Sequence, residues 1–306
     1  MGTPLRWVAF NAFILLAIFL DLRFFHRKPH KSTVGEAALW SAIWIGISIL
    51  FGIGVHYAFG APAALEYFTG YLIEKALSVD NLFLFLIIFR AFAVDERVQQ
   101  RLLEWGVIGA LLMRGIMIAA GAALIERFTW ILYVLGAFLV YAGIHMLFAK
   151  KETMHPEKNA IFRFAMQHLR VTRDYQGEHY FVRRSGQLLA TPLFLILLVV
   201  EITDITLAVD SIPAIFGITR DPFIVYTSNV FAILGLRALY FLLAGVLGRM
   251  RYLTAGLSCI LVFIGAKMIL EPWFHINVQV SLSTVAAILL ISLLASLRSP
   301  APTNPT

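Results

Sequence analysis

Residues 72–89 read LIEKALSVDNLFLFLIIF, an apolar run interrupted by four polar side chains: Glu74, Lys75, Asp80 and Asn81. A second run, at residues 200–216, reads VEITDITLAVDSIPAIF. Residues 77–81 align with residues 207–211 without a gap, and another acid lies six positions before the aspartate in each run. Charged side chains inside a membrane helix are costly, which makes them functional candidates. Two such stretches in corresponding places predict a duplicated transporter with a site between its halves.

The composition predicts an integral membrane protein. The 306-residue chain is 60% hydrophobic and 14% charged, whereas a soluble domain is about 25% charged. Cys259 is the only cysteine, which excludes an internal disulfide, a redox dithiol and a cysteine-based zinc cluster. The apolar run at residues 7–20 lacks a small-residue cleavage site and continues into Asp21 and Arg23, so we expect a retained first helix.

Nine segments contain the roughly 20 mostly apolar residues that a spanning helix needs. They lie at residues 5–24, 38–59, 65–90, 104–126, 129–149, 189–213, 224–247, 252–271 and 277–297. We therefore predict an all-α polytopic membrane protein in which residues 1–298 form a single transmembrane domain. A cytoplasmic loop is expected at 150–188, and a Pro-rich, disordered tail at 299–306.

Basic residues in the loops predict the orientation, because cytoplasmic loops carry an excess of Lys and Arg. The loops after spans 1, 3, 5 and 7, together with the tail, hold most of them. The opposite side holds only Arg6, Arg127 and Arg220. This pattern places the N-terminus outside and the C-terminus in the cytoplasm. We expect the basic loop 151–187 to be a connector on the membrane surface, with partner binding as the alternative.

The resemblance between the two polar stretches extends over three spans each. Residues 109–115 around Arg114 resemble residues 232–238 around Arg237, and the segment at His145 resembles that at Lys267. Repeat A at 65–149 therefore corresponds to repeat B at 189–271. Because span 3 starts outside and span 6 starts inside, we predict an inverted three-helix repeat (spans 3–5 and 6–8), with a substrate site near the membrane midplane.

Carboxylates and bases accompany one another inside the predicted spans. The acids are Glu74, Asp80, Glu201, Asp204 and Asp210, with the amide Asn81; the supporting charge partners are Lys75, Arg114, Arg237, Lys267 and His145. One interpretation is a set of buried ion pairs that hold helices together, with both arginines fixing the carboxylates. The other is a site for Mg²⁺, Ca²⁺ or Mn²⁺, which prefer oxygen ligands.

The acids of one run cannot share a face on an unbroken helix. At about 100° per residue, residues six apart point about 120° apart, which applies to both runs. Either the helices unwind near Asp80 and Asp210, for which Pro213 is a candidate cause, or each helix offers one acid to a ligand and another to an arginine.

The two motifs, EKALSVDNLF at residues 74–83 and EITDITLAVDSIPAIF at residues 201–216, resemble those of the TerC family of bacterial inner-membrane proteins, which includes the Alx type. The similarity covers about residues 5–297. It implies a multi-spanning transporter of the lysine-exporter superfamily type that exports manganese from the cytoplasm, with an association with tellurium resistance and with alkaline or envelope stress. The family's intramembrane acids carry over to Glu74, Asp80, Glu201, Asp204 and Asp210, with Asn81 beside Asp80.

Three functions are therefore considered. The first is a secondary exporter of Mn²⁺, with Ca²⁺ as an alternative substrate and protons as the counter-ion. The second is a membrane scaffold or stress-complex subunit without transport, and the third is an amino-acid exporter. We expect no prosthetic group, no nucleic-acid partner and no enzymatic activity, because the chain carries no nucleotide loop and no nucleophile–base motif.

Overall fold

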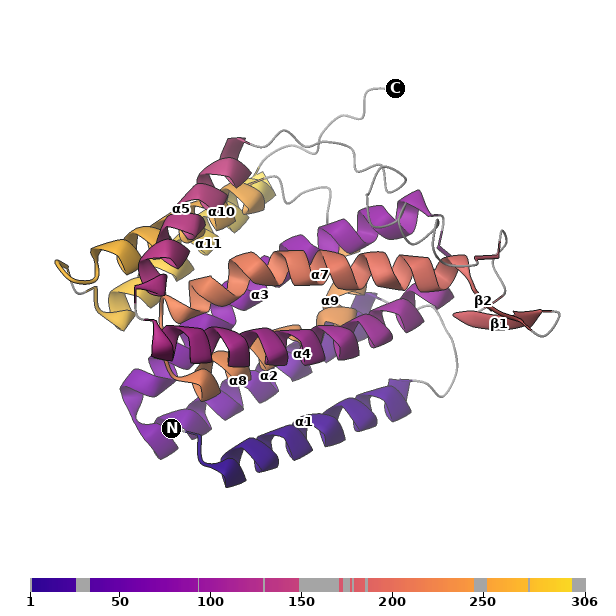
Figure 1. Ribbon diagram of the computed structural model, residues 1–306, viewed down its shortest axis with the longest axis horizontal. Coiled ribbons are helices and arrows are strands. Elements are labelled where there is room, and N and C mark those ends of the chain that lie inside the picture. Colours follow the sequence, from indigo (N-terminus) through magenta and orange to yellow (C-terminus); the bar gives the residue numbers. More distant parts are fainter. Residues whose placement is uncertain are drawn as a thin grey trace.

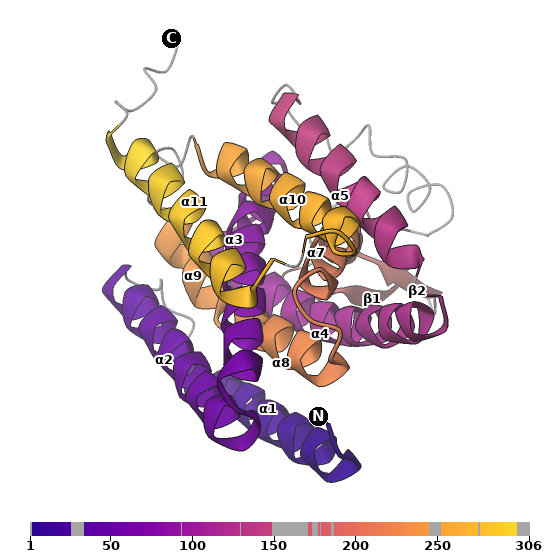
Figure 2. The same ribbon diagram turned by 90° about the vertical axis from the view of Figure 1, so that its left-hand side faces the viewer.

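The computed structural model describes residues 2–25, 34–92, 94–128, 130–148, 171–172, 177, 179–184, 187–244, 252–274 and 276–298. Each predicted span is helical, and the helices pack side by side (Figures 1 and 2). In order they are α1 (Pro4–Phe25), α2 (Val34–Phe59), α3 (Ala61–Ala91), α4 (Glu96–Arg127), α5 (Ile131–Phe148), α7 (Pro192–Phe216), α8 (Pro222–Ile233), α9 (Leu236–Ala244), α10 (Leu253–Leu270) and α11 (Val278–Arg298).

The prediction of an all-α polytopic membrane protein is confirmed. Within the described residues, eight helical segments are long and apolar enough to cross a membrane. Helix α3 is not among them, because its 31 residues carry several charges, but it lies inside the bundle against α2, α7, α8 and α11. We therefore treat α3 as a further crossing, with Glu74 enclosed by the other helices.

The helices of the two predicted repeats run in opposite directions. Helix α3 begins at the end of the bundle where α7 and α10 finish, and α8 begins there too (Figure 1). Helix α3 packs against α8, α7 packs against α4, and α5 packs against α10. If α3 and α4 correspond to α7 and α8, the contact between α3 and α8 is the counterpart of the contact between α7 and α4. The repeat itself stays a prediction.

Two local features depart from the sequence prediction. The span expected at 224–247 is two helices, because α8 ends before Leu234 and Gly235 takes a positive φ of 81°, a conformation that glycine adopts without strain. The loop after α5 ends in an antiparallel hairpin, with β1 (Phe181–Arg184) paired to β2 (Gln187–Ala190). Most of that loop, and the predicted disordered tail, lie outside the described residues.

Glycine allows α5 and α10 to approach closely. A Cβ atom built on Gly265 would lie 2.8 Å from the backbone nitrogen of Val140 and still closer to the carbonyl oxygen of Gly136. A Cβ atom on Gly143 would lie 2.7 Å from the carbonyl oxygen of Ser258. Small residues at helix crossings are a common means of packing in membranes, where apolar burial does not favour one helix neighbour over lipid.

We predict that Gly265→Ala destabilises the protein by about 1–3 kcal/mol, because the added methyl group forces the two backbones apart. Thermal unfolding in detergent measures the effect. Gly46→Ala in α2 is the matched control, since nothing lies within 4 Å of a Cβ atom at that position. Equal stability of the two variants would contradict the close packing of α5 and α10.

Candidate functional site

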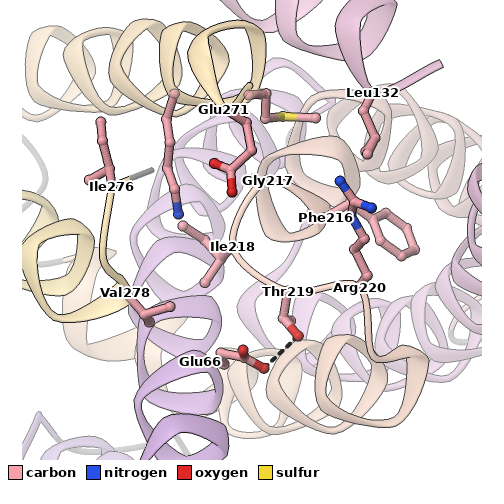
Figure 3. Close-up of a pocket in the computed structure, with 12 residues that line it drawn as sticks. Glu66, Leu132, Phe216, Gly217, Ile218, Thr219, Arg220, Glu271, Ile276 and Val278 are labelled. Carbon is pink, nitrogen blue, oxygen red and sulfur yellow. Dashed lines mark hydrogen bonds between the residues drawn. The ribbon is translucent and has the colours of Figure 1, made fainter. Parts of the chain in front are cut away.

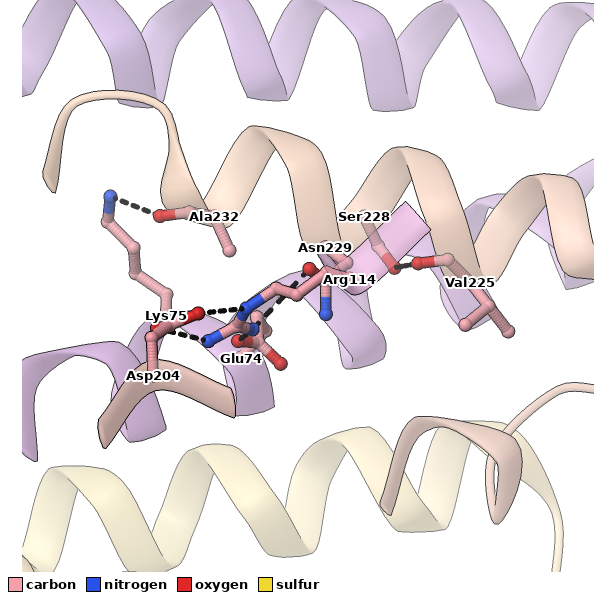
Figure 4. A network of polar contacts seen from close by, with 8 residues as sticks. All are labelled: Glu74, Lys75, Arg114, Asp204, Val225, Ser228, Asn229 and Ala232. Atoms are coloured by element: carbon pink, nitrogen blue, oxygen red, sulfur yellow. Dashed lines mark hydrogen bonds and ion pairs between the residues drawn. The ribbon is translucent and has the colours of Figure 1, made fainter. Parts of the chain in front are cut away.

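A buried arginine joins one acid from each polar stretch. Arg114 of α4 is 1% exposed, and it lies between Glu74 of α3 and Asp204 of α7 (Figure 4). Its Nε donates to Asp204 Oδ2 at 3.2 Å, and its Nη2 donates to Asp204 Oδ1 at 3.1 Å. Its Nη1 donates to Glu74 Oε1 and, at 3.4 Å, to Asn229 Oδ1 of α8. This fork geometry is the one in which arginine holds carboxylates most firmly.

Helical spacing brings these groups together. Along α3, Glu74, Ser78 and Asn81 are all buried at positions i, i+4 and i+7, which places them on one face. The equivalent face of α7 carries Asp204 and Ser211, also buried at an interval of seven. Because α3 and α7 pack against each other, two buried polar faces meet near the middle of the bundle. Polar and charged residues are rarely fully buried in protein interiors.

The cluster carries more negative than positive charge and leaves polar atoms unused. Two carboxylates share one guanidinium, and Glu74 is 0% exposed. Four buried atoms of this region find no hydrogen-bond partner in the described part of the chain: Glu74 Oε2, Ser78 Oγ, Ser211 Oγ and Asn229 Nδ2. A buried polar group without a partner costs about 1–3 kcal/mol. These atoms are therefore the natural contacts for a ligand or water.

None of the other predicted ligands whose side chains the structure describes makes a hydrogen bond or ion pair with Arg114. Asn81 is buried on the α3 face, whereas the side chain of Asp80 lies outside the described residues. Glu201 is half-buried against α4, where a Cβ atom on Gly109 would overlap its carboxylate. Asp210 is half-buried on α7. Among the residues that the structure describes, no group of three or more His, Cys, Asp or Glu side chains is placed to hold a metal.

Both helices stay continuous, which decides between the two geometries considered for the acids. Helix α3 remains helical through Asp80, and α7 remains helical through Asp210 and Pro213 to Phe216. The expectation of unwinding near the aspartates is therefore wrong. Each helix instead presents one acid to Arg114, whereas the other part of that alternative, a second acid offered to a ligand, stays a prediction. The backbone break occurs between α8 and α9.

Lys75 stabilises the break between α8 and α9. Its Nζ donates to the carbonyl oxygen of Ala232 at 3.1 Å and to that of Leu234 at 3.5 Å (Figure 4). The last carbonyls of a helix lack partners within the helix and form the negative end of its dipole, so an ammonium group stabilises them. Lys75 is therefore turned toward the end of α8, while its neighbour Glu74 bonds to Arg114.

The other supporting partners differ in role. Arg114 pairs with the predicted acids, but Arg237 does not: its guanidinium binds Asp21 of α1 and Glu104 of α4, each at 2.9 Å. Sequence reasoning placed these two acids near the ends of spans and gave them no role. His145 is exposed on α5, with its ring stacked on Tyr141, and Lys267 is buried near the end of α10.

Sequence reasoning also missed Asn229. It is 0% exposed in α8 and accepts a hydrogen bond from Arg114. The available signal was its position in an apolar span, between Ser228 and Val230, where a polar side chain needs a partner.

A polytopic membrane protein with charged side chains paired at mid-bundle is the class that this fold and site define. The chain belongs to the TerC family of integral membrane proteins, whose sequence pattern matches residues 59–303.

Curated relatives cover nearly the whole chain. The membrane protein STKORF319 of Myxococcus xanthus is 46% identical over 297 residues, which are 97% of this chain and 93% of that protein. A protein of Escherichia coli K12, named as the membrane-bound redox modulator Alx, is 46% identical over 301 residues, covering 95% and 94% of the two chains. A membrane protein of Rickettsia bellii is 39% identical over 292 residues, covering 95% and 97%. No solved structure matches the chain significantly.

We predict that Arg114→Met lowers the free energy of unfolding by about 3–5 kcal/mol, because it leaves two acids buried without their cation. Denaturant or thermal unfolding in detergent measures this. Arg127→Met, at the exposed end of the same helix, should change stability by less than about 0.5 kcal/mol.

Adding Glu74→Gln and Asp204→Asn to Arg114→Met should recover much of the loss, because no buried charge then lacks a partner. If Arg114→Met proves as stable as Arg127→Met, the guanidinium does not neutralise the acids in the folded protein.

Proposed function

We propose that this protein is a secondary transporter that exports Mn²⁺ from the cytoplasm, with the cluster of Glu74, Asp204 and Asn229 as its central site. The observation that supports the proposal most strongly is the charge of that cluster. Two buried carboxylates share one guanidinium, and one oxygen of Glu74 has no partner among the described residues. A buried net negative charge attracts a cation or a proton.

The atoms of the site suit a hard cation. Carboxylate, amide and hydroxyl oxygens come from Glu74, Asp204, Asn229, Ser78 and Ser211, and such oxygens favour Mg²⁺, Ca²⁺ and Mn²⁺ over softer metals. The choice of Mn²⁺ among these rests on resemblance to the TerC family. Ca²⁺ is the alternative substrate.

Arg114 acts as a tethered cation in this proposal. While the site is free of metal, its guanidinium pairs with both acids and offsets one of their two negative charges. An arriving dication competes for the same oxygens, so Arg114 must yield at least one carboxylate. Because a bound dication would also favour loss of protons from neighbouring acids, exchange of Mn²⁺ for external protons follows from the same electrostatics.

The proposed direction of transport, out of the cytoplasm, rests on resemblance to the TerC family. The proposed topology, with the N-terminus outside and the C-terminus in the cytoplasm of a bacterial inner membrane, is supported by the excess of Lys and Arg in the loops on one side. Acids from two helices of opposite direction converge at mid-bundle, as expected where a substrate site is reached from either side in turn. The proposal involves ion binding and conformational change without an enzymatic step.

Other readings remain as alternatives that an experiment separates. A scaffold or stress-complex subunit would use the cluster only to hold α3, α4 and α7 together. The name of the Escherichia coli relative refers to redox modulation. A redox role of this chain could not use an internal dithiol, because Cys259 is its only cysteine.

We predict that purified protein in liposomes transports Mn²⁺. The rate should be higher when a proton gradient drives protons across the membrane in the direction opposite to Mn²⁺ than when no gradient is present. Glu74→Gln and Asp204→Asn should each lower the rate by at least about tenfold, which corresponds to about 1.4 kcal/mol of lost ion stabilisation. Both changes preserve side-chain shape. Glu126→Gln, an exposed acid on α4, is the matched control and should transport normally.

Absence of Mn²⁺ flux from correctly inserted wild-type protein would favour the scaffold. Flux of amino acids in place of metal would favour the amino-acid exporter. Normal Mn²⁺ flux in both site variants would remove the central cluster from the transport mechanism.

A further inference from the structure

A second polar cavity lies at the end of the bundle where α3 begins. Its volume is about 270 Å³, and it is lined by residues of α3, the segment after α7, the end of α10 and the start of α11 (Figure 3). The polar side chains that matter here are Glu66, Thr219, Lys267 and Glu271. The proposed orientation places this end outside the cell.

The cavity resembles the central cluster in that a buried basic side chain, Lys267, lies near two acids. The hydroxyl of Thr219 donates to Glu66 Oε2 at 2.6 Å (Figure 3). Lys267 is 4% exposed and is attracted by both Glu66 and Glu271. Its ammonium nevertheless makes no hydrogen bond or ion pair within the described part of the chain. Lys267 is therefore close to both acids without being fixed to either, unlike Arg114 in the central cluster.

Two helix ends add negative potential to the cavity. Helix α7 ends at Phe216 and α10 ends at Leu270, and both C-terminal ends adjoin residues that line the space. The C-terminal end of a helix carries about half a negative charge from its unpaired carbonyl groups. Arg220 also lines the cavity, but Figure 3 shows its side chain beside Phe216, away from Glu66. The Glu66 side of the cavity is thus suited to cations.

Helix α3 runs from the cavity to the central cluster and packs tightly between them. Glu66 and Glu74 lie eight residues apart on α3, a rise of about 12 Å. Between them, Gly70 faces Ser228: a Cβ atom there would lie 2.9 Å from Ser228 Oγ and 3.3 Å from Ile215 Cγ2. Ser228 directly precedes Asn229 of the cluster. Movement of a cation from Glu74 to this end of the bundle would require the close contact at Gly70 to open.

We propose that this cavity is a second, weaker binding site (station) for the exported divalent cation. The ammonium of Lys267 competes with the cation for the same acids and so promotes its release. The proposal rests on the proposed function. Glu66, Glu271 and the hydroxyl of Thr219 supply hard oxygen ligands. The nearby ammonium lowers the affinity by repelling the dication and by occupying the same acids once the ion has left. Release to the outside then needs no further conformational change at this station.

The test counts bound Mn²⁺ by electron paramagnetic resonance during titration of the full-length protein in detergent, with Mn²⁺ alone as the probe. The wild type should bind two ions with different affinities. Glu66→Gln combined with Glu271→Gln should weaken the second site by about tenfold or more and leave the first unchanged. Glu126→Gln, an exposed acid on α4 near the same end, should bind as the wild type does.

Lys267 provides a test with the opposite sign. Lys267→Met should tighten the second site by about tenfold and slow Mn²⁺ release from liposomes, because the competing charge is gone. Lys267→Arg retains the charge and should behave as the wild type. A structural lysine would not produce tighter binding when removed. Should Lys267→Met fail to fold, the variant that combines Glu66→Gln with Glu271→Gln still tests the second site, and the affinity of Lys267→Arg tests the role of the charge.

The outcomes separate this inference from the proposed function. A single Mn²⁺ site that is lost in Asp204→Asn and kept in the Glu66–Glu271 variant overturns the second station alone. A site that is lost only in the Glu66–Glu271 variant, with Asp204→Asn binding and transporting normally, supports the station and removes the central cluster from the mechanism. Unchanged affinity in Lys267→Met overturns the competitor role.

Discussion

The structure depends on one buried guanidinium that two helices of opposite direction share. Arg114 receives Glu74 from α3 and Asp204 from α7, and all three side chains are almost completely buried. Removing charges from water is costly and mutual attraction only partly offsets that cost. The arrangement therefore has to be complete to be tolerated, and it fixes the relative positions of α3, α4 and α7. The same arrangement leaves an excess of one negative charge, which is the physical basis for binding a cation.

The architecture and most of the central cluster could be predicted from the sequence. Apolar runs of spanning length located the helices, and acids inside them identified Glu74 and Asp204, because both signals act within a single segment. Residue spacing also offered, as one of two alternatives, that each helix presents one acid to an arginine and another to a ligand; the continuous helices α3 and α7 exclude the unwinding alternative. The larger ligand set could not be resolved this way: Glu201 lies against Gly109 of α4, and Asp210 lies elsewhere on α7.

Long-range pairing explains what the sequence did not reveal. Arg237 binds Asp21, which lies 216 residues away, and no local pattern couples those positions. Helix α8 ends at a single glycine in a span whose apolar composition resembles that of a continuous helix, so the bonds from Lys75 to its last carbonyls were not predictable either. Asn229 was visible as an isolated polar residue, but its partner became evident only when α4 and α8 were placed together.

The account's central claim is that a divalent cation replaces Arg114 as the partner of Glu74 and Asp204. The most direct measurement is an anomalous difference map, recorded at the manganese absorption edge, from crystals of the protein equilibrated with Mn²⁺. The account predicts a peak between these carboxylates, with the guanidinium withdrawn from at least one of them. Saturating Mn²⁺ with no peak there, and with Arg114 still bound to both acids, would contradict it.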